Sequence, residues 1–372
     1  MRREFLDKAK RVVVKVGSAV LTNDDGLNLA VMAGLAQDLC TLMREGREVV
    51  LVSSGAVAAG RKSLGLGSRP LVMREKQATA ALGQVRLMRE YEDIFGGLNQ
   101  KVAQVLLTHD DLANRDRYLN IRNTLFTMFD WRILPIINEN DTVSVKELRF
   151  GDNDTLAAMT TNMIEADLLI CLSDIDGLYT ANPATHPEAR LVSTVAAVDS
   201  EIEAMAGQPA GSLGTGGMQS KIKAARMVSV RGGSSFIGPG RAPGTLRRLF
   251  SGEQVGTFFL PQEEKMQSRK HWIAFTLRPK GYLVLDDGAC LAVTAGGKSL
   301  LPSGILETRG NFRIGDPVQC LDRNEEPLAA GLVNYSAEDI RKVQGRHSTE
   351  IKELLGFVDS EEIIHRDNLV VL

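Results

Sequence analysis

The sequence predicts an α/β protein: an open, mainly parallel sheet covered by helices on both faces, followed by a small β-barrel domain. Short apolar runs alternate along the chain with longer segments of helical spacing, the pattern of strands joined by crossover helices. These runs end in polar residues, as parallel strands do at the ligand-binding edge of a sheet. With 372 residues the chain exceeds what one core usually serves, which indicates two domains.

The elements of the first domain follow from the spacing of apolar residues. Expected strands are residues 11–16, 48–55, 101–107, 133–137 and 168–172, and expected helices are residues 29–45, 74–95, 117–129 and about 155–165. Gly46 is a C-cap signal for the first of these helices, and Asp or Asn before Thr155 is an N-cap signal for the last.

The second domain is set apart by a polar linker at about residues 261–272, which opens with Pro261. We expect domains over residues 1–262 and 273–372. Short apolar runs at residues 282–285, 290–293 and 317–321, separated by glycines, predict the strands of the barrel. Residues 296–299, Gly-Gly-Lys-Ser, end like a P-loop but lack its first glycine, so we interpret them as a hairpin turn.

Composition is that of an ordinary globular protein, with 44% hydrophobic and 24% charged residues. A net charge of −2, from 44 basic and 46 acidic residues, provides no overall field for nucleic acid or an anionic membrane. The four cysteines are widely spaced without a Cys-x-x-Cys pair, which favours reduced core residues over a metal site. Since no apolar stretch could span a bilayer and the charged first residues differ from a signal peptide, we expect a cytoplasmic protein.

Two polar clusters surround one short insertion. Residues 138–141, Asn-Glu-Asn-Asp, follow the strand at 133–137, and residues 152–154, Asp-Asn-Asp, open the next helix. Strand ends and helix starts are where open α/β sheets bind ligands. Amides donate to carboxylates and carboxylates accept from ammonium groups, so the mixture suits a small zwitterion. The alternative is that these residues only form turns.

Two lysines and a glycine-rich loop suggest a phosphate site. Lys15 interrupts a valine run just before Gly17 and Ser18, and Lys221 follows the loop at residues 211–220 near the expected start of a helix. Glycines let backbone amides approach a phosphate, and a helix start attracts anions. Neither a Walker A sequence nor Gly-x-Gly-x-x-Gly is present. An edge-strand lysine and a flexible surface loop are the alternatives.

Ser54, at the end of the second strand, is not in a Gly-x-Ser-x-Gly nucleophile elbow, because residue 52 is Val. We therefore expect it to hold a ligand carboxylate. Two lysines, a glycine loop and carboxylates, without a metal-ligand cluster, indicate phosphoryl transfer to an acceptor that needs no base. A carboxylate acceptor is already ionised at neutral pH, so positioning and charge stabilisation by the lysines and Mg²⁺ suffice.

Six motifs in chain order resemble those of the glutamate 5-kinases, a branch of the amino acid kinase family. They are the segments around Lys15, Ser54, residues 138–141, residues 152–154, Ser173 to Tyr179 and residues 214–221. The resemblance implies an amino acid kinase-like fold, ATP and Mg²⁺. It also implies catalytic roles for Lys15, Lys221 and Asp154, glutamate binding by Ser54, Asn138, Asp141 and Asn153, and ATP binding by Lys15, Ser173, Asp174, Thr215, Gly216, Gly217, Met218, Gln219, Ser220 and Lys221.

The sequence departs from the family pattern at two positions, with Ser173 for Thr and Asn182 for Asp, and the second leaves details of the nucleotide loop open. Residues 303–305 and 310–318 resemble the PUA domain, which also occurs in RNA-modifying enzymes. An RNA-binding protein is thus one alternative, although residues 265–372 carry 14 Lys and Arg against 15 Asp and Glu. A related kinase for acetylglutamate, aspartate or a nucleoside monophosphate is another.

The same resemblance implies the partners. They are L-glutamate and ATP as substrates, proline as a feedback inhibitor, a homo-oligomer (dimer or tetramer) and a glutamyl phosphate reductase that takes the product. No membrane partner is expected, and the near-neutral second domain argues against RNA. The residues that hold Mg²⁺ are left unassigned.

Overall fold

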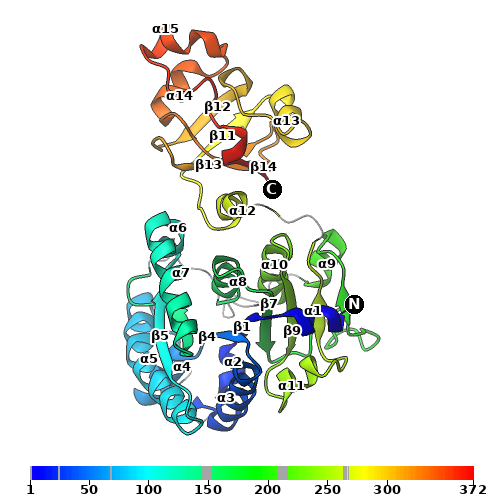
Figure 1. Cartoon of the computed structure of the whole chain (residues 1–372). Helices are drawn as coiled ribbons and strands as arrows, with labels where there is room; N and C mark the ends of the chain where they lie inside the picture. The colour runs from blue at the N-terminus through cyan, green and yellow to red at the C-terminus, as the bar shows by residue number, and fades with distance from the viewer. Residues whose placement is uncertain are drawn as a thin grey trace. The chain divides into compact units, whose positions relative to one another are not determined.

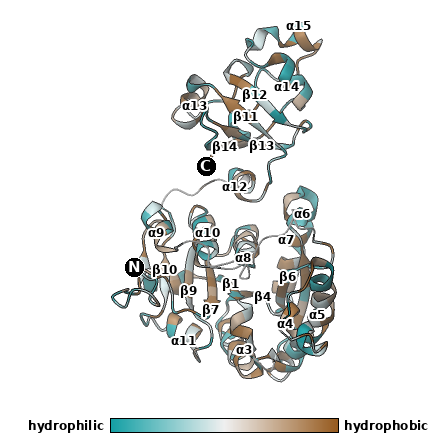
Figure 2. Ribbon diagram, turned by 180° about the vertical axis from the view of Figure 1, so that it is seen from behind, coloured by the Kyte–Doolittle hydropathy of each residue, from teal (hydrophilic) through white to brown (hydrophobic). Residues whose placement is uncertain are grey.

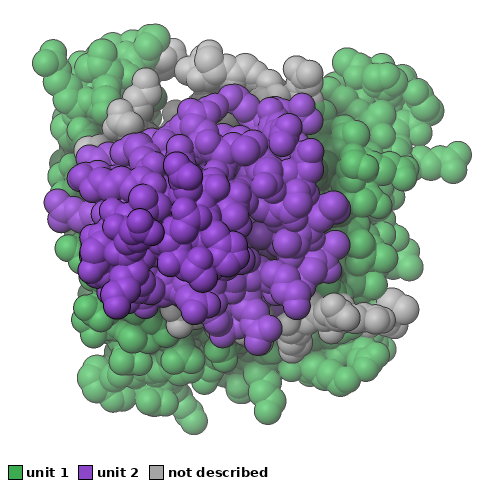
Figure 3. Space-filling view, turned by 90° about the horizontal axis from the view of Figure 1, so that it is seen from above, with its two compact units in different colours: residues 1–265 green, residues 266–372 purple. Residues whose placement is uncertain are grey.

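A computed structural model describes residues 2–23, 26–67, 69–144, 153–207, 217–262, 266 and 268–372. The chain divides into two compact units, Met1–Lys265 and Met266–Leu372, each with its own core (Figure 3). Asp152, Thr215 and Gly216, three residues of the predicted motifs, lie outside the described residues.

Unit 1 contains an eight-stranded sheet (Figure 1). In spatial order its strands are β5 (Val102–Leu107), β6 (Leu134–Glu139), β4 (Glu48–Ser53), β1 (Arg11–Val16), β7 (Leu168–Ser173), β9 (Ser234–Pro239), β10 (Thr257–Phe259) and β8 (Thr194–Val195). Neighbouring strands pair in parallel except β9 and β10. A separate two-residue pair joins β2 (Thr22–Asn23) to β3 (Gly26–Leu27).

Helices cover both faces of this sheet, which confirms the predicted fold (Figure 1). The longer helices are α3 (Leu29–Arg44), α4 (Ala56–Ser63), α5 (Met73–Gly96), α7 (Arg115–Asp130), α8 (Asn153–Met163) and α10 (Met218–Ser229). The shorter ones are α1 (Arg2–Lys8), α2 (Ser18–Leu21), α6 (His109–Ala113), α9 (Ser200–Met205) and α11 (Thr245–Phe250).

The alternation of side chains along β1 decides which of them contact the helices on each face of the sheet. Val12, Val14 and Val16 belong to the core cluster that also includes α3, α5 and α11. The strands of this sheet are coloured mainly hydrophobic in Figure 2. Successive side chains of a strand point to opposite faces, so Lys15 points away from that core. It faces the side where α8 packs on β1 and β7.

Unit 2 is built on a separate five-stranded mixed sheet, in the order β12 (Ile305–Gly310), β11 (Gly281–Leu285), β13 (Pro317–Leu321), β14 (Pro327–Leu332) and β15 (Leu369–Val371). Its helices are α12 (Ser268–Phe275), α13 (Asp287–Thr294), α14 (Ala337–Val343) and α15 (Ile351–Leu355), with short 3₁₀ turns at Pro302–Gly304, Ser348–Glu350 and Arg366–Asn368. The sequence predicted a small β-barrel here, and a separate strand-rich domain is confirmed, with these five strands in one sheet.

Two sequence interpretations within unit 2 are wrong. Residues 290–293 were expected to form a strand, but they lie inside α13, where Asp286 caps the first turn by accepting from the amide of Ala289 at 2.7 Å. Residues 296–299 are not a hairpin turn. They terminate α13, since the amide of Gly296 donates to Leu291 and Gly297 has a positive φ of 57°.

Candidate active site

The centre of the site is one carboxylate held between two lysines. Asp154 lies in the first turn of α8 and is fully buried. Lys15 of β1 places its Nζ 2.5 Å from Oδ1 of Asp154, and Lys221 of α10 places its Nζ 3.2 Å from Oδ2. Both lysines are themselves buried, with 5% and 4% of their surfaces exposed. Three residues from distant parts of the sequence thus form a single charged cluster.

Electrostatics keep this carboxylate ionised. Burial alone would raise the pKa of Asp154, but the charges of Lys15 and Lys221 and the hydrogen bonds from Lys15 and Ser220 outweigh it and lower the pKa below its ordinary value. Two ammonium groups thus lie on one carboxylate. In a site shielded from bulk water, a positive charge attracts an anionic ligand more strongly than it would at the surface.

The start of α10 contributes further anion-binding groups. Gly217 occupies the N-cap position and caps without a side-chain hydrogen bond. The first amides of a helix have no partner within the helix, and its dipole is positive at this end. Ser220 links this turn to the charged cluster, because its Oγ contacts the carbonyl of Gly217 at 2.8 Å and Oδ2 of Asp154 at 2.7 Å. Lys221 follows in the same turn.

A polar group beside the charged cluster joins three elements. Asn153, the first residue of α8, donates from Nδ2 to Oγ of Ser54 at 2.9 Å and to Oδ1 of Asn138 at 3.0 Å. Asn138 belongs to β6, and Ser54 follows β4. The structure therefore brings together three of the four residues predicted to bind an amino acid. Asp141 is half-buried in the turn that follows β6.

Of the remaining residues predicted to bind ATP, Ser173 and Gln219 make hydrogen bonds to residues outside the lysine cluster. Ser173 ends β7, is buried, and donates to Oδ1 of Asp174 at 3.0 Å, whereas Asp174 is exposed. Gln219 is exposed and its Nε2 donates to the carbonyl of Gly207 at 2.6 Å, so it does not contact the lysine cluster through that bond. Met218 opens α10 and is half-buried.

Sequence reasoning missed Gln84, and it assigned no separate role to Glu139 within the cluster at residues 138–141. Gln84, in the middle of α5, accepts from Nδ2 of Asn138 at 2.9 Å, while the backbone amide of Glu139 donates to Oδ1 of Asn138 at 2.9 Å. These bonds fix the orientation of the Asn138 amide. The buried carboxylate of Glu139 accepts from Oγ of Ser144 at 2.7 Å. Nothing in the helical pattern distinguishes Gln84 from the other polar residues of α5.

Close packing of two helices sets the position of Gln84. A Cβ atom on Gly83 of α5 would lie 1.8 Å from the carbonyl oxygen of Ala56, the first residue of α4. On the other side of the contact, a Cβ on Gly60 would lie 1.9 Å from the carbonyl oxygen of Thr79. Glycine at both positions lets the backbones approach, and Gln84 is thereby held next to Asn138.

The described residues contain neither a cluster of metal ligands nor a membrane-spanning helix. Among them, no group of three or more His, Cys, Asp and Glu side chains is placed to hold a metal ion. Mg²⁺ in nucleotide sites is usually held by one or two carboxylates together with substrate phosphates and waters, which requires no such group. Within the same residues, every helix is too short or too polar to cross a bilayer.

Comparison with known proteins covers the whole chain. The family model of the amino acid kinase family matches residues 10–237, and that of the PUA domain matches residues 281–355. A glutamate 5-kinase of Desulfotalea psychrophila is 57% identical over all of this chain and 99% of its own length. Another, of Syntrophotalea carbinolica, is 50% identical over the full length of both. A solved carbamate kinase of Giardia lamblia, 15% identical, superposes with a TM-score of 0.49 over 68% of this chain and 99% of its own.

Proposed function

The chain belongs to the amino acid kinase family, and because its full-length relatives are glutamate 5-kinases, we propose that the Lys15–Asp154–Lys221 cluster is its phosphoryl-transfer centre. The enzyme transfers the γ-phosphoryl group of ATP to the side-chain carboxylate of L-glutamate, and the product is L-glutamyl 5-phosphate, the first intermediate of proline biosynthesis. The observation that carries the catalytic assignment is the meeting of two buried lysines on one carboxylate.

The chemistry asks for positioning and charge stabilisation. Glutamate brings an ionised carboxylate, so no general base is required. Lys15 and Lys221 stabilise the negative charge on the transferring phosphoryl group and on the departing phosphate. Asp154 positions both ammonium groups, whose charges stabilise the transition state. Mg²⁺ bound together with ATP would supply further positive charge against its phosphates.

Glutamate binding is assigned to the polar group beside this cluster. Ser54 and Asn153 meet through a hydrogen bond, and Asn138 joins them through its Oδ1. Hydroxyl and amide donors suit the α-carboxylate of an amino acid. Asp141, in the turn that follows β6, would accept from the substrate ammonium group. N-acetylglutamate lacks that ammonium group, so this assignment favours glutamate over its acetylated form.

ATP binding is assigned to the end of β7 and the start of α10. The amides at the start of α10, near Gly217 and Met218, would hold phosphate oxygens together with Lys221. Thr215, Gly216, Gln219 and Ser220 complete the segment that resembles the family's nucleotide loop. Ser173 and Asp174 would contact the nucleoside, as the family resemblance implies.

Regulation and assembly remain part of the proposal. Proline, the end product, would inhibit by competing at the glutamate site, since both ligands are zwitterionic amino acids. The enzyme would act in the cytoplasm as a homo-oligomer and pass its labile acyl phosphate to a glutamyl phosphate reductase.

The decisive test is an assay of ADP formation with L-glutamate as acceptor, with hydroxylamine present to trap the acyl phosphate as a hydroxamate. Parallel reactions contain N-acetyl-L-glutamate, L-aspartate or UMP in place of glutamate. We expect glutamate-dependent ADP and an equal amount of hydroxamate, with little product from the other acceptors. Strong activity with another acceptor, or ADP without hydroxamate, would overturn the assignment.

A further inference from the structure

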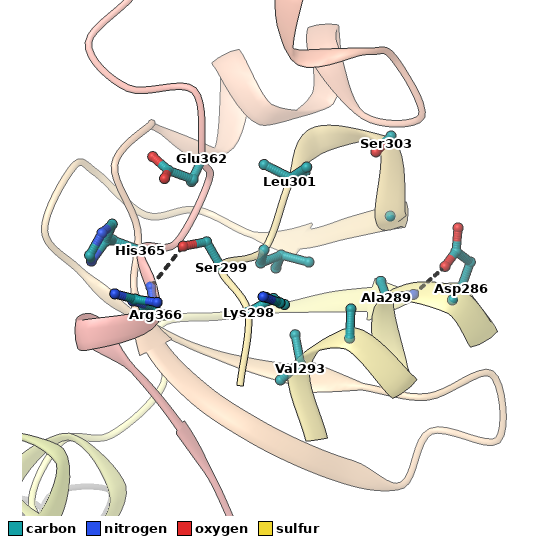
Figure 4. A pocket seen from close by; sticks show the side chains of 14 residues that line it. Asp286, Ala289, Val293, Lys298, Ser299, Leu301, Ser303, Glu362, His365 and Arg366 are labelled. Atoms are coloured by element: carbon teal, nitrogen blue, oxygen red, sulfur yellow. Dashed lines mark hydrogen bonds between the residues drawn. The ribbon is translucent and has the colours of Figure 1, made fainter. Parts of the chain in front are cut away.

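Unit 2 contains a cavity of about 710 Å³ that the proposed kinase mechanism does not use. It lies between α13, residues 298–304 and residues 362–366 (Figure 4). Binding sites for small molecules typically measure about 300–1,000 Å³. The cavity is therefore large enough for a ligand the size of a nucleotide.

Two basic residues of this cavity lack an acidic partner. Among the described residues, Lys298 and Arg366 make no ion pair, whereas Lys280 and Lys342 of the same unit contact Asp316 and Glu338 at 2.7 and 2.9 Å. Both Lys298 and Arg366 are exposed, so their charges are available to a ligand. Two exposed cations among the lining residues of one cavity favour an anionic ligand there.

Backbone hydrogen bonds hold the two segments that carry these cations next to each other. An isolated bridge pairs Leu300 with Ile364, and the amide of Leu300 donates to the carbonyl of Ile364 at 2.9 Å. Beside it, the amide of Arg366 donates to Oγ of Ser299 at 3.0 Å, the bond drawn at the left of Figure 4. The cationic end is thus built by two paired segments that are distant in sequence.

His365 adds a hydrogen-bond donor at the same end. Its Nδ1 accepts from the amide of Asp367 at 3.2 Å, so a neutral ring carries its proton on Nε2. That nitrogen can donate to a phosphate oxygen. Lys298, His365 and Arg366 together match an oxygen-rich anion better than a single charge would.

The rest of the cavity suits the body of a compact ligand. Apolar side chains from α13, such as Ala289 and Val293, line it, and Asp286 lies at the end opposite His365 and Arg366 (Figure 4). Two carboxylates, those of Asp286 and Glu362, also line the cavity. A long polyanion would be repelled by these carboxylates, whereas a small molecule can place one anionic group at the cations and a hydrogen-bond donor near Asp286.

We propose that this cavity of unit 2 binds a free nucleoside monophosphate, with the phosphate at Lys298, His365 and Arg366 and the base along α13 toward Asp286. The exocyclic amine of an adenine or cytosine would donate to that carboxylate. The site is separate from the ATP site in unit 1, and its occupancy does not depend on the kinase assignment.

Amide hydrogen exchange of the full chain, measured by mass spectrometry with and without AMP, tests this proposal. We expect AMP to slow exchange in peptides that cover residues 286–304 and 362–368. In the variant Lys298→Ala/Arg366→Ala, the AMP concentration needed for this protection should rise about tenfold or more, since each lost bond to a charged group weakens binding. Any protection around Gly217 should persist, which shows that the variant is folded and still meets AMP.

The matched control is Lys352→Ala, which removes an exposed positive charge of unit 2 outside the cavity and should leave the protection unchanged. Protection confined to unit 1, or equal protection in the double variant, would refute the proposal. So would equal protection by inorganic phosphate, which has no base. An RNA oligonucleotide with a 5′-hydroxyl that displaces AMP as well as AMP itself does would assign the cavity to nucleic acid instead.

Discussion

Lys15 reaches across the sheet surface to Asp154, with its Nζ 2.5 Å from Oδ1 of a carboxylate that has no solvent-exposed surface. The contact depends on the alternation of side chains in β1, which places Lys15 on the same face as Val13. It also depends on where α8 begins, because Asp154 lies in the first turn of that helix. Asp154 also meets Lys221, so the position of each ammonium group depends on the other. Changes at these residues should therefore affect both turnover and folding. Kinetic and unfolding measurements can distinguish the two effects.

Replacing Lys221 by alanine should lower kcat by about a hundredfold or more, because it removes a charge that acts on the transferring phosphoryl group. Steady-state assays of ADP release would measure the change. Lys223→Ala is the matched control, since Lys223 lies on the same helix and is exposed. Unchanged turnover in Lys221→Ala would remove this lysine from the mechanism.

Replacing Asp154 by asparagine should destabilise the protein, because two buried lysines would lose their carboxylate. Breaking a buried ion pair by removing one partner typically costs about 3–5 kcal/mol. Urea unfolding of the wild type and Asp154→Asn would measure the difference. A variant as stable as the wild type would show that the two ammonium groups find other partners.

The stability difference between these two proteins should also depend on pH. The pKa of Asp154 is lowered in the folded state from its ordinary value of 3.8. A lowered pKa stabilises the fold fully above the ordinary value, and this contribution is lost as pH falls through the folded-state pKa. Unfolding curves should hence show a constant difference near neutral pH that shrinks below about pH 4. A difference that stays constant into stronger acid would contradict the lowered pKa.

Asp141→Asn should mainly weaken the binding of glutamate, since an amide cannot replace a carboxylate as the partner of an ammonium group. We expect KM for glutamate to rise about tenfold or more with a smaller change in kcat. Initial rates over a range of glutamate concentrations would give both constants. Asp130→Asn, at the exposed end of α7, provides a charge-matched control. A wild-type KM in Asp141→Asn would exclude this contact.

Gln84 should act on glutamate binding through Asn138. Its Oε1 accepts from Nδ2 of Asn138, so Gln84→Ala removes one of the hydrogen bonds that orient the Asn138 amide. We expect KM for glutamate to rise by about threefold to tenfold, the loss of one ordinary hydrogen bond. Gln84→Glu keeps an acceptor oxygen and should restore most of the affinity. A wild-type KM in Gln84→Ala would show that this hydrogen bond does not contribute to glutamate binding.

The sequence predicted well whatever depends on local patterns and sheet geometry. The strand predicted at residues 11–16 coincides with β1, because a short β-branched run between polar residues strongly favours a buried strand. The meeting of Lys15 and Lys221 was anticipated because parallel strands and the helices that follow them direct their ends to one edge.

Other features needed information that local patterns lack. Residues 290–293 are four apolar residues, too few to distinguish helical from strand spacing, and the capping of α13 by Asp286 decided the outcome. Gln84 occupies an ordinary polar position of an amphipathic helix. Its contact with Asn138 depends on how α5 packs, which no spacing in the sequence reveals.

The packing of α5 against α4 leads to the last prediction, that Gly83→Ala is strongly destabilising. The added Cβ would lie 1.8 Å from the carbonyl oxygen of Ala56, so the two helices must separate. Gly34→Ala is the control, because Gly34 lies within α3 and a Cβ there would meet no atom within 4 Å. Alanine is favoured over glycine in a helix by about 0.5–1 kcal/mol, so this control should be stabilised. We expect Gly83→Ala to lose about 1–3 kcal/mol of unfolding free energy, as overpacked cores do, and to bind glutamate more weakly because Gln84 shifts with its helix. Urea unfolding and glutamate KM, measured for both variants, would test this. If both alanines stabilise the protein equally, the close approach of α4 and α5 is not required for the fold.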